Sequence, residues 1–231
     1  MGDEELEIEA GAPEVSADEW MARAALFELL SLGLLKPGRP IAEALASGEF
    51  AAACAETLGA LGLGDAAAAA GVDLADYEGD NAEKIYHEVL REYTRLFVGT
   101  REPLITPFAG VRASQAQGQR GLLFVGKESM AVERFMRRCG VAKNLAAGQS
   151  NDPVDHIGTM CEFAKFLCLV NARAVVPAEG ARVEPGDFDA FMDDHFVSYA
   201  VWCAGQLREL SSVPFYRAMA ALLDAAVSVS R

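Results

Sequence analysis

Residues 80–98 read DNAEKIYHEVLREYTRLFV, and the spacing of their apolar side chains decides the fold class. These side chains recur every three or four positions, which is the period of one face of an α-helix. They are Ile85, Val89, Tyr93 and Leu96, with Tyr86, Leu90 and Phe97 beside them. At the start of the segment, Asp80 and Glu83 have the spacing of a capping box. The segment therefore predicts an amphipathic helix.

The same period recurs along most of the chain. A first helix is expected from Asp18 to the stop signal Lys36-Pro37-Gly38, and a second from about Pro40 to Leu58. Residues 59–79 are rich in Gly and Ala, so we expect loops with a weak helix there. Residues 99–121 contain two prolines and break the pattern, which predicts a long connection.

Further helices are expected in the second half of the chain. One covers Val132 to Cys139 and is closed by Gly140 just past its end. A longer helix opens at Asn151-Asp152-Pro153 and runs to about Val176. Two more begin around Phe188 and Phe215. Neither a sheet nor an internal repeat is evident, so the sequence predicts an all-α, single-domain helical bundle over residues 18–231, after a disordered acidic tail over residues 1–17.

Charge and cysteine usage restrict the class of partner and the compartment. The formal net charge of −14 repels nucleic acid and anionic lipid surfaces and attracts cationic partners, although acidity also simply keeps a protein soluble. The five cysteines form no CxxC pair, which indicates reduced thiols. The acidic start excludes a secretory signal, and no apolar run is long enough for a bilayer. We therefore expect a cytoplasmic protein without stable membrane insertion.

Enzymatic motifs are weak or absent. None of the three histidines has a glutamate three residues before it, so the Glu-x-x-His pair of di-iron bundles is missing. Residues 121–128 have the glycine and lysine spacing of a phosphate loop, but Glu128 stands where Ser or Thr must hold magnesium. No Gly-x-Ser-x-Gly element indicates a hydrolase. The sequence predicts no metal, no cofactor and no catalytic activity.

The most informative stretch is NDPVDHIGTMCEFAKFL, residues 151–167. Its structural interpretation is a helix start, with Asp152 as the cap, Pro153 in the first turn and Asp155 as the capping-box acid. Its functional interpretation notes that Asp155 and Glu162 are seven residues apart, on one helical face. Two such carboxylates could bind a guanidinium group in bidentate geometry. Both interpretations stay open, and Glu162 could equally pair with a lysine.

This stretch resembles the signature of the TorD/DmsD/NarJ-type chaperones for molybdoenzymes. Pro-x-Asp-His-Ile, followed by Glu-Phe and an apolar helix, is similar to that signature. Four further elements agree in order and spacing over roughly residues 20–225. They are Arg23 to Leu30 in the first helix, the Tyr93-x-x-Leu96-Phe97 element, the Pro107-Phe108 loop, and the closing pattern of His195, Trp202 and Phe215-Tyr216. The loop departs from the family pattern at Gly110 and Arg112.

The resemblance implies a function and a site. Members of this family bind the twin-arginine leader of the catalytic subunit of a molybdopterin oxidoreductase and assist its cofactor loading before export. It implies that Asp155, with Glu162, meets the guanidinium groups and that His156 hydrogen-bonds the peptide or braces the loop. A groove for the apolar part of the leader would then include Tyr93, Leu96, Phe97, Pro107 and Phe108. Core packing is an equal expectation for Leu96.

The competing hypothesis is a helical scaffold or regulator with no signal-peptide role. Within the family, the nitrate-reductase branch serves enzymes that often lack a cleaved leader, and the sequence does not choose between branches. The client, the choice between monomer and dimer, and any direct binding of molybdopterin or GTP stay open at this level.

Overall fold

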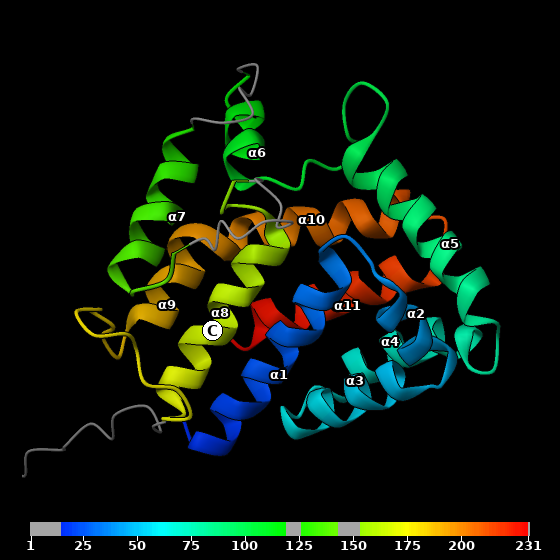
Figure 1. Cartoon of the computed structure of the whole chain (residues 1–231), viewed down its shortest axis with the longest axis horizontal. Helices are drawn as coiled ribbons and strands as arrows, with labels where there is room; N and C mark the ends of the chain where they lie inside the picture. The colour runs from blue at the N-terminus through cyan, green and yellow to red at the C-terminus, as the bar shows by residue number, and fades with distance from the viewer. Residues whose placement is uncertain (1–14, 119–125, 143–152, 231) are drawn as a thin grey trace, which may run out of the picture.

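The computed structural model describes residues 15–118, 126–142 and 153–230, and these residues form helices without a β-strand (Figure 1). In chain order the α-helices are α1 (Ala17–Leu34), α2 (Arg39–Ala46), α3 (Glu49–Ala60), α4 (Gly64–Leu74), α5 (Ala82–Tyr93), α6 (Ala109–Ala116), α7 (Lys127–Arg138), α8 (Ile157–Asn171), α9 (Asp187–Phe191), α10 (Val197–Leu210) and α11 (Pro214–Ser228). Three single turns complete the order: η1 (Ala75–Tyr77), a 3-10 turn, and the π-helical turns η2 (Thr94–Val98) and η3 (Met192–Phe196). The prediction of an all-α single-domain bundle is confirmed.

The core lies where α1 crosses α8; α11 packs against α1, and α10 packs against α11 (Figure 1). Phe27 of α1 is fully buried, and its ring lies 5.9 Å from that of Phe188 and 5.7 Å from that of Phe196. Each such buried phenylalanine contributes roughly 2–3 kcal/mol by its removal from water. A Cβ on Gly33 would lie 2.1 Å from the sulfur of Met219, so the absence of a side chain allows α1 and α11 to approach closely.

The helix expected from Pro40 to Leu58 is in fact two helices. Gly48 adopts a φ of 76° between α2 and α3, a left-handed conformation that glycine adopts without steric cost. Residues 59–79 are more regular than expected, because α4 runs through them and buries Ala70 and Leu74. Alanine-rich sequence has high helix propensity, and packing of α4 against α3 and α11 supplies the rest.

The start of α5 corrects the predicted capping box by one residue. The cap is Asn81, whose side-chain oxygen accepts a hydrogen bond from Lys84 N at 3.0 Å. Asp80 instead accepts from Asn81 N at 2.8 Å and pairs with the Lys84 ammonium at 2.6 Å. Glu83 does not return to the cap, because it pairs with Arg39 of α2. A tertiary ion pair thus replaces the local contact that the spacing suggested.

The long connection expected over residues 99–121 contains a helix, α6, in its second half. Residues 119–121 lie outside the described part of the chain. The first part, residues 99–108, is a loop that is tied to its surroundings at both ends. Ile105 N donates to Leu96 O at 2.9 Å, and the Tyr199 hydroxyl donates to Thr106 O at 2.7 Å.

The predicted limits of α8 are also wrong. The helix begins at Ile157 rather than in the segment led by Pro153, and it ends at Asn171 rather than near Val176. Arg173, with a φ of 59°, adopts the left-handed conformation that reverses the chain after the helix. Asn151 and Asp152, which were expected to open this helix, lie outside the described residues.

The remaining predictions fit more closely. Gly140, with a φ of 77°, follows the end of α7 as expected. The helix expected from Phe188 onward is interrupted by the π-helical turn η3 between α9 and α10. Of the acidic tail expected over residues 1–17, residues 1–14 lie outside the described part; Ser16 caps α1 through Glu19 N. No helix among the described residues is long and apolar enough to cross a membrane.

Candidate functional site

The Pro107-Phe108 loop and the Asp155-His156 segment, which are far apart in the sequence, pair directly. Ile157 N donates to Pro107 O at 2.8 Å, and Ala109 N donates to Asp155 O at 3.1 Å. Phe108 and His156 form an isolated antiparallel bridge, and their rings lie 5.5 Å apart, edge to face. Two of the motifs singled out in the sequence therefore form one unit, which we call the junction (residues 105–110 and 153–158).

The carboxylate of Asp155 lies at the centre of the junction and is 1% exposed as a residue. Its Oδ2 accepts a hydrogen bond from Gly110 N at 2.8 Å, and its Oδ1 accepts one from the Ser129 hydroxyl at 3.0 Å. Burial raises the pKa of Asp155, the two hydrogen bonds lower it, and the charge of Glu128 raises it further, so that the pKa lies above 3.8. In this arrangement Asp155 joins α6, α7 and the start of α8.

Gly110 is required by this close approach. A Cβ at this position would lie 3.0 Å from Asp155 Oδ2 and 3.4 Å from both the N and the Cβ of Ser129. The first distance is tighter than ordinary van der Waals contact and the other two are at its limit, so a Cβ would require Asp155 to move by a few tenths of an ångström. The departure from the family loop at Gly110 thus has a physical reason.

His156 is the cap of α8, a role that the sequence had given to Asp152. The Nδ1 atom of His156 accepts a hydrogen bond from Gly158 N at 3.1 Å. A nitrogen that accepts an N–H cannot carry a proton itself, so this geometry fixes the proton of a neutral ring on Nε2. His156 is buried at the junction, and its part in peptide binding stays a prediction.

Tyr93, Leu96 and Phe97 point into the core, which confirms the packing expected for Leu96. Their exposed fractions are 9%, 0% and 3%. The Phe97 ring lies 5.3 Å from that of Tyr93 and 5.9 Å from that of Tyr216, so the Tyr-x-x-Leu-Phe element meets the closing Phe-Tyr element. A direct contact of these three side chains with a peptide stays a prediction.

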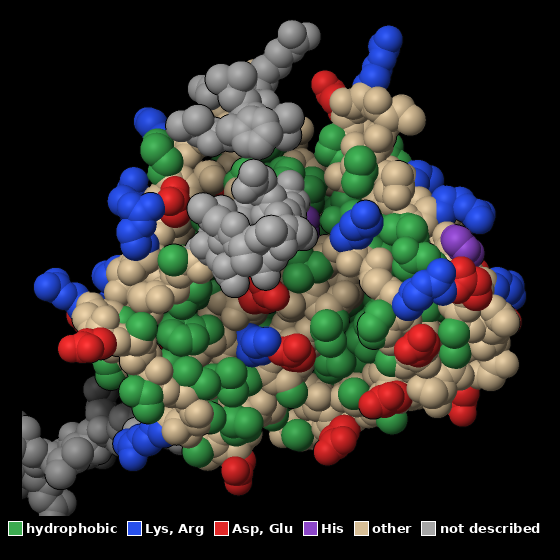
Figure 2. Space-filling model, in the orientation of Figure 1, with side chains coloured by type: hydrophobic (Ala, Val, Ile, Leu, Met, Phe, Trp, Pro, Cys, Tyr) green, Lys and Arg blue, Asp and Glu red, His purple; other side chains and the backbone are tan. Residues whose placement is uncertain are grey.

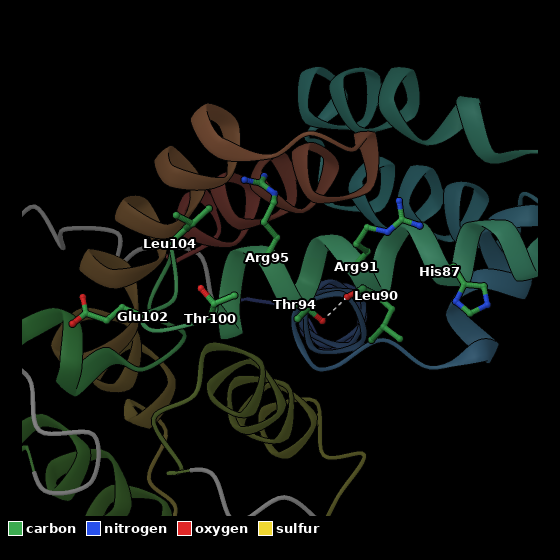
Figure 3. Close-up of a pocket in the computed structure, with 9 residues that line it drawn as sticks. His87, Leu90, Arg91, Thr94, Arg95, Thr100, Glu102 and Leu104 are labelled. Atoms are coloured by element: carbon green, nitrogen blue, oxygen red, sulfur yellow. Dashed lines mark hydrogen bonds between the residues drawn. The ribbon is translucent and has the colours of Figure 1, made fainter.

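Sequence reasoning missed the opposite face of the same helix, which lines a cavity of about 690 Å³ (Figure 3). Its lining comes from α5, η2 and the loop after them: His87, Leu90, Arg91, Thr94, Arg95, Gly99, Thr100, Glu102 and Leu104. Leu104 is 49% exposed at the end of the cavity. The spacing of residues 87, 91 and 94 does place them on one helical face. Such a mixed polar face cannot be distinguished in the sequence from a helix face that is simply exposed to solvent.

Glu162 lies on α8, four residues after the last residue of the junction. Because α8 begins only at Ile157, Asp155 is not on the helix, and the helical spacing that would place Glu162 on its face does not apply. Glu162 is exposed on α8, but partial desolvation by its neighbours raises its pKa, while the charge of Lys165 lowers it and that of Glu28 raises it. Lys165 in turn pairs with Glu28 of α1. Glu162 thus interacts with Lys165 and Glu28, whereas Asp155 interacts with Gly110 and Ser129, so the two carboxylates have no charged or hydrogen-bonding neighbour in common among the residues that the structure describes.

A second, polar cavity of about 200 Å³ lies among α6, α7, η3 and α10. Its polar lining residues are Arg112, Glu128, Asp194, His195, Ser198 and Tyr199. The Nδ1 atom of His195 lies 2.6 Å from Glu128 Oε1. The sequence did not predict that these residues meet, because they come from four separate elements; of them, only His195 was part of a motif that the resemblance used. Among the described residues, no group of three or more His, Cys, Asp and Glu is arranged to hold a metal ion.

Comparison with known proteins fits this arrangement. The model of the family described as "Nitrate reductase delta subunit" matches residues 61–204, which include α5, α6, α7, α8 and most of α10. A relative from Haemophilus influenzae, named "Probable Tat proofreading chaperone DmsD", is 24% identical over 138 residues. That alignment covers 60% of this chain and 58% of the relative, so the similarity spans little more than half of either protein. Because the family model matches well over half of the chain, the protein belongs to the nitrate reductase delta subunit family.

Proposed function

We propose that the chain is a chaperone that binds the twin-arginine leader of the catalytic subunit of a molybdopterin oxidoreductase and assists its maturation in the cytoplasm before export. One observation carries the proposal: motifs that are distant in sequence, Pro107-Phe108 and Asp155-His156, pair directly at the end of a loop whose first part lines an apolar cavity. Membership of the family and the name of the relative, a probable Tat proofreading chaperone, support it.

The 690 Å³ cavity suits the apolar stretch that follows the arginines in such a leader. Pockets of this size accommodate several side chains of a peptide, and Leu90 and Leu104 offer apolar contact on two sides (Figure 3). Tyr93, Leu96 and Phe97 support the wall from behind. Basic side chains at the cavity, Arg91 and Arg95, disfavour the leader's own arginines there, so the charged part of the leader binds elsewhere.

The junction positions the loop rather than offering a free carboxylate. Two donors already occupy Asp155, so a guanidinium group reaches it only where Ser129 gives way. In the proposed function, Pro107, Phe108, Asp155 and His156 hold the loop that lines the 690 Å³ cavity. Glu162, exposed on α8, contributes to the acidic field that attracts the leader.

Calorimetric titration tests the proposal. The titrants are twin-arginine leaders from molybdoenzyme genes of the same organism, with lysine-lysine versions as controls. Leu104→Ser should weaken binding about tenfold, because it removes about 1–2 kcal/mol of apolar contact. Leu32→Ser is the matched control, since Leu32 is 47% exposed on α1 and lines none of the cavities described above.

Binding that weakens with lysine and with Leu104→Ser, but not with Leu32→Ser, supports the function and the cavity together. Equal affinity for arginine and lysine leaders, or no binding to any leader, contradicts the leader-binding function and favours the scaffold hypothesis or the leaderless branch of the family.

A further inference from the structure

The polar cavity has features that fit one chemical group, the guanidinium of an arginine. Two carboxylates from different elements line it, Glu128 of α7 and Asp194 of the π-helical turn η3. Ser198 and Tyr199 of α10 line the same space, and the Tyr199 hydroxyl is already used in its hydrogen bond to Thr106 O. A π-helical turn widens the helix by one residue, and such turns occur often at functional sites. Here the turn carries both Asp194 and the neighbouring His195, which line the cavity together.

An arginine of the chain itself lines this cavity and places its guanidinium group over a neighbouring aromatic ring. Arg112 of α6 lines it, and the guanidinium carbon of Arg112 is 4.8 Å from the centroid of the Trp202 ring. The Trp202 ring stacks on that of Tyr199 at 5.9 Å with an interplanar angle of 17°. The two rings form an aromatic surface on which a planar cation gains cation–π attraction.

The charges at this surface are not matched. Among the described residues, no carboxylate lies within 4 Å of the Arg112 guanidinium group, and no basic group lies within 4 Å of the Asp194 carboxylate. Glu128 is paired with His195, which carries a full charge only when protonated. A cation therefore lies beside two carboxylates without a close ion pair, and one carboxylate remains available to a second cation.

We infer that this cavity binds an arginine side chain of the leader and that Arg112 is an intramolecular stand-in which the incoming arginine displaces. The inference rests on the proposed function and names the recognition subsite within it. The entering guanidinium would stack on Trp202 and hydrogen-bond to Asp194 and Glu128. Lysine forms neither the planar stack nor the forked hydrogen bonds, so this subsite would distinguish arginine from lysine.

The experiment uses the full chain with Trp20→Phe, which leaves Trp202 as the fluorescent reporter because the sequence has two tryptophans. The variants are Arg112→Ala, Asp194→Asn and the matched control Arg134→Ala, since Arg134 is exposed on α7 and lines neither cavity. Arg112→Ala should bind the leader roughly threefold more tightly, because the leader no longer competes with a cation–π contact. Asp194→Asn should bind about fivefold more weakly, and Arg134→Ala should be unchanged.

A second titration uses N-acetylarginine amide and N-acetyllysine amide as probes, with Trp202 fluorescence as the readout. The arginine amide should give a saturable change that is stronger in Arg112→Ala, and the lysine amide should give none. Leader affinity that is unchanged or weaker in Arg112→Ala overturns the inference. Should no leader bind any variant, the proposed function fails, and the amide titration alone decides whether the cavity holds a guanidinium.

Discussion

Two buried tyrosines, Tyr199 and Tyr216, differ in the state of their hydroxyl groups. The Tyr199 hydroxyl donates to Thr106 O at 2.7 Å and holds the loop of residues 99–108 against α10. The Tyr216 hydroxyl is buried and has no hydrogen-bond partner among the described residues. A buried hydroxyl without a partner costs free energy, whereas a paired one contributes modestly to stability.

We therefore expect opposite effects of the same substitution at the two positions. Tyr199→Phe should lower the free energy of unfolding by about 1–2 kcal/mol, because it leaves Thr106 O unpaired. Tyr216→Phe should leave it unchanged or raise it by up to about 1 kcal/mol. Urea unfolding followed by circular dichroism measures both. A larger loss in Tyr216→Phe than in Tyr199→Phe would contradict the assignment.

A methyl group at Gly110 tests the packing of the junction. Gly110→Ala places a Cβ 3.0 Å from Asp155 Oδ2 and should cost about 1–3 kcal/mol of stability through overpacking. Gly59→Ala is the control, because its Cβ would have no atom within 4 Å and α3 should gain helix propensity. Thermal unfolding should thus show a lower midpoint for Gly110→Ala alone. Equal midpoints would show that the junction tolerates displacement.

At this scale the sequence singled out individual residues but not the partners that the structure gives them. Asp155 and His156 were visible as a polar pair before an apolar helix. Which of them caps the helix depends on where the chain turns, and that turn is set by hydrogen bonds to Pro107 and Gly110, over 40 positions away. Local spacing contains no information about such contacts.

At the scale of elements, α7 is held to the start of α9 by an ion pair. Arg138 donates to both oxygens of Asp187, at 2.7 and 3.0 Å, and Glu184 N donates to the same carboxylate at 2.7 Å. Burial alone would raise the pKa of Asp187, but Arg138 and the Glu184 N–H outweigh it, so that the pKa lies below 3.8. Glu92, paired with Arg95, likewise has its pKa lowered below 4.5.

Because both carboxylates stabilise the folded protein only while they are ionised, the protein should become less stable in acid. A lowered folded-state pKa contributes stability that is present above the unfolded-state pKa and is lost as pH falls through the folded-state value. For Asp187 that loss should begin below about pH 5 and continue past 3.8. Asp187→Asn should lower the free energy of unfolding by roughly 1 kcal/mol at neutral pH, a modest amount because Arg138 is partly exposed. It should also make the stability depend less on pH in the acid range. Urea unfolding midpoints measured between pH 3 and 7 test this. If Asp187→Asn and the parent protein lose stability equally as the pH falls, the Arg138–Asp187 pair does not contribute to the loss in acid.

The helices themselves were predictable, while their limits and irregular turns were not. Periodicity located the segments of α1, α5, α7, α8 and α11, because each buries one face. It did not separate α2 from α3, because the left-handed glycine at position 48 sits inside a continuous apolar pattern. Nor could it find the π-helical turns η2 and η3, which border the two cavities, because one extra residue in a turn changes the spacing too little to be read from sequence.

At the scale of the whole molecule, acidic and basic side chains are both present on the visible face, with basic ones gathered over α7 and near α5 (Figure 2). The net charge of −14 nonetheless sets the long-range field. A cationic leader should therefore be attracted from solution before it makes any specific contact. Such attraction is weakened by salt, because the Debye length falls as ionic strength rises.

Leader affinity should fall about tenfold between low and high ionic strength, chiefly through a slower association rate. Stopped-flow fluorescence over a range of sodium chloride concentrations measures the rate. The lysine-lysine leader should show the same salt dependence, since it has the same charge, but a faster dissociation rate. An association rate that does not change with salt would mean that the acidic surface has no part in recognition.

The cysteines have a consequence for chemical labelling. All five are buried and reduced, and burial raises the pKa of Cys54 and Cys203 to about 12 and that of Cys139 to about 11. Maleimides react with thiolates, which these thiols scarcely form in the folded state near neutral pH. A substitution such as Val176→Cys, at a side chain 90% exposed, would then give one reactive thiol in an otherwise native chain. Dyes and spin labels can thus be attached at chosen surface positions without first replacing the natural cysteines.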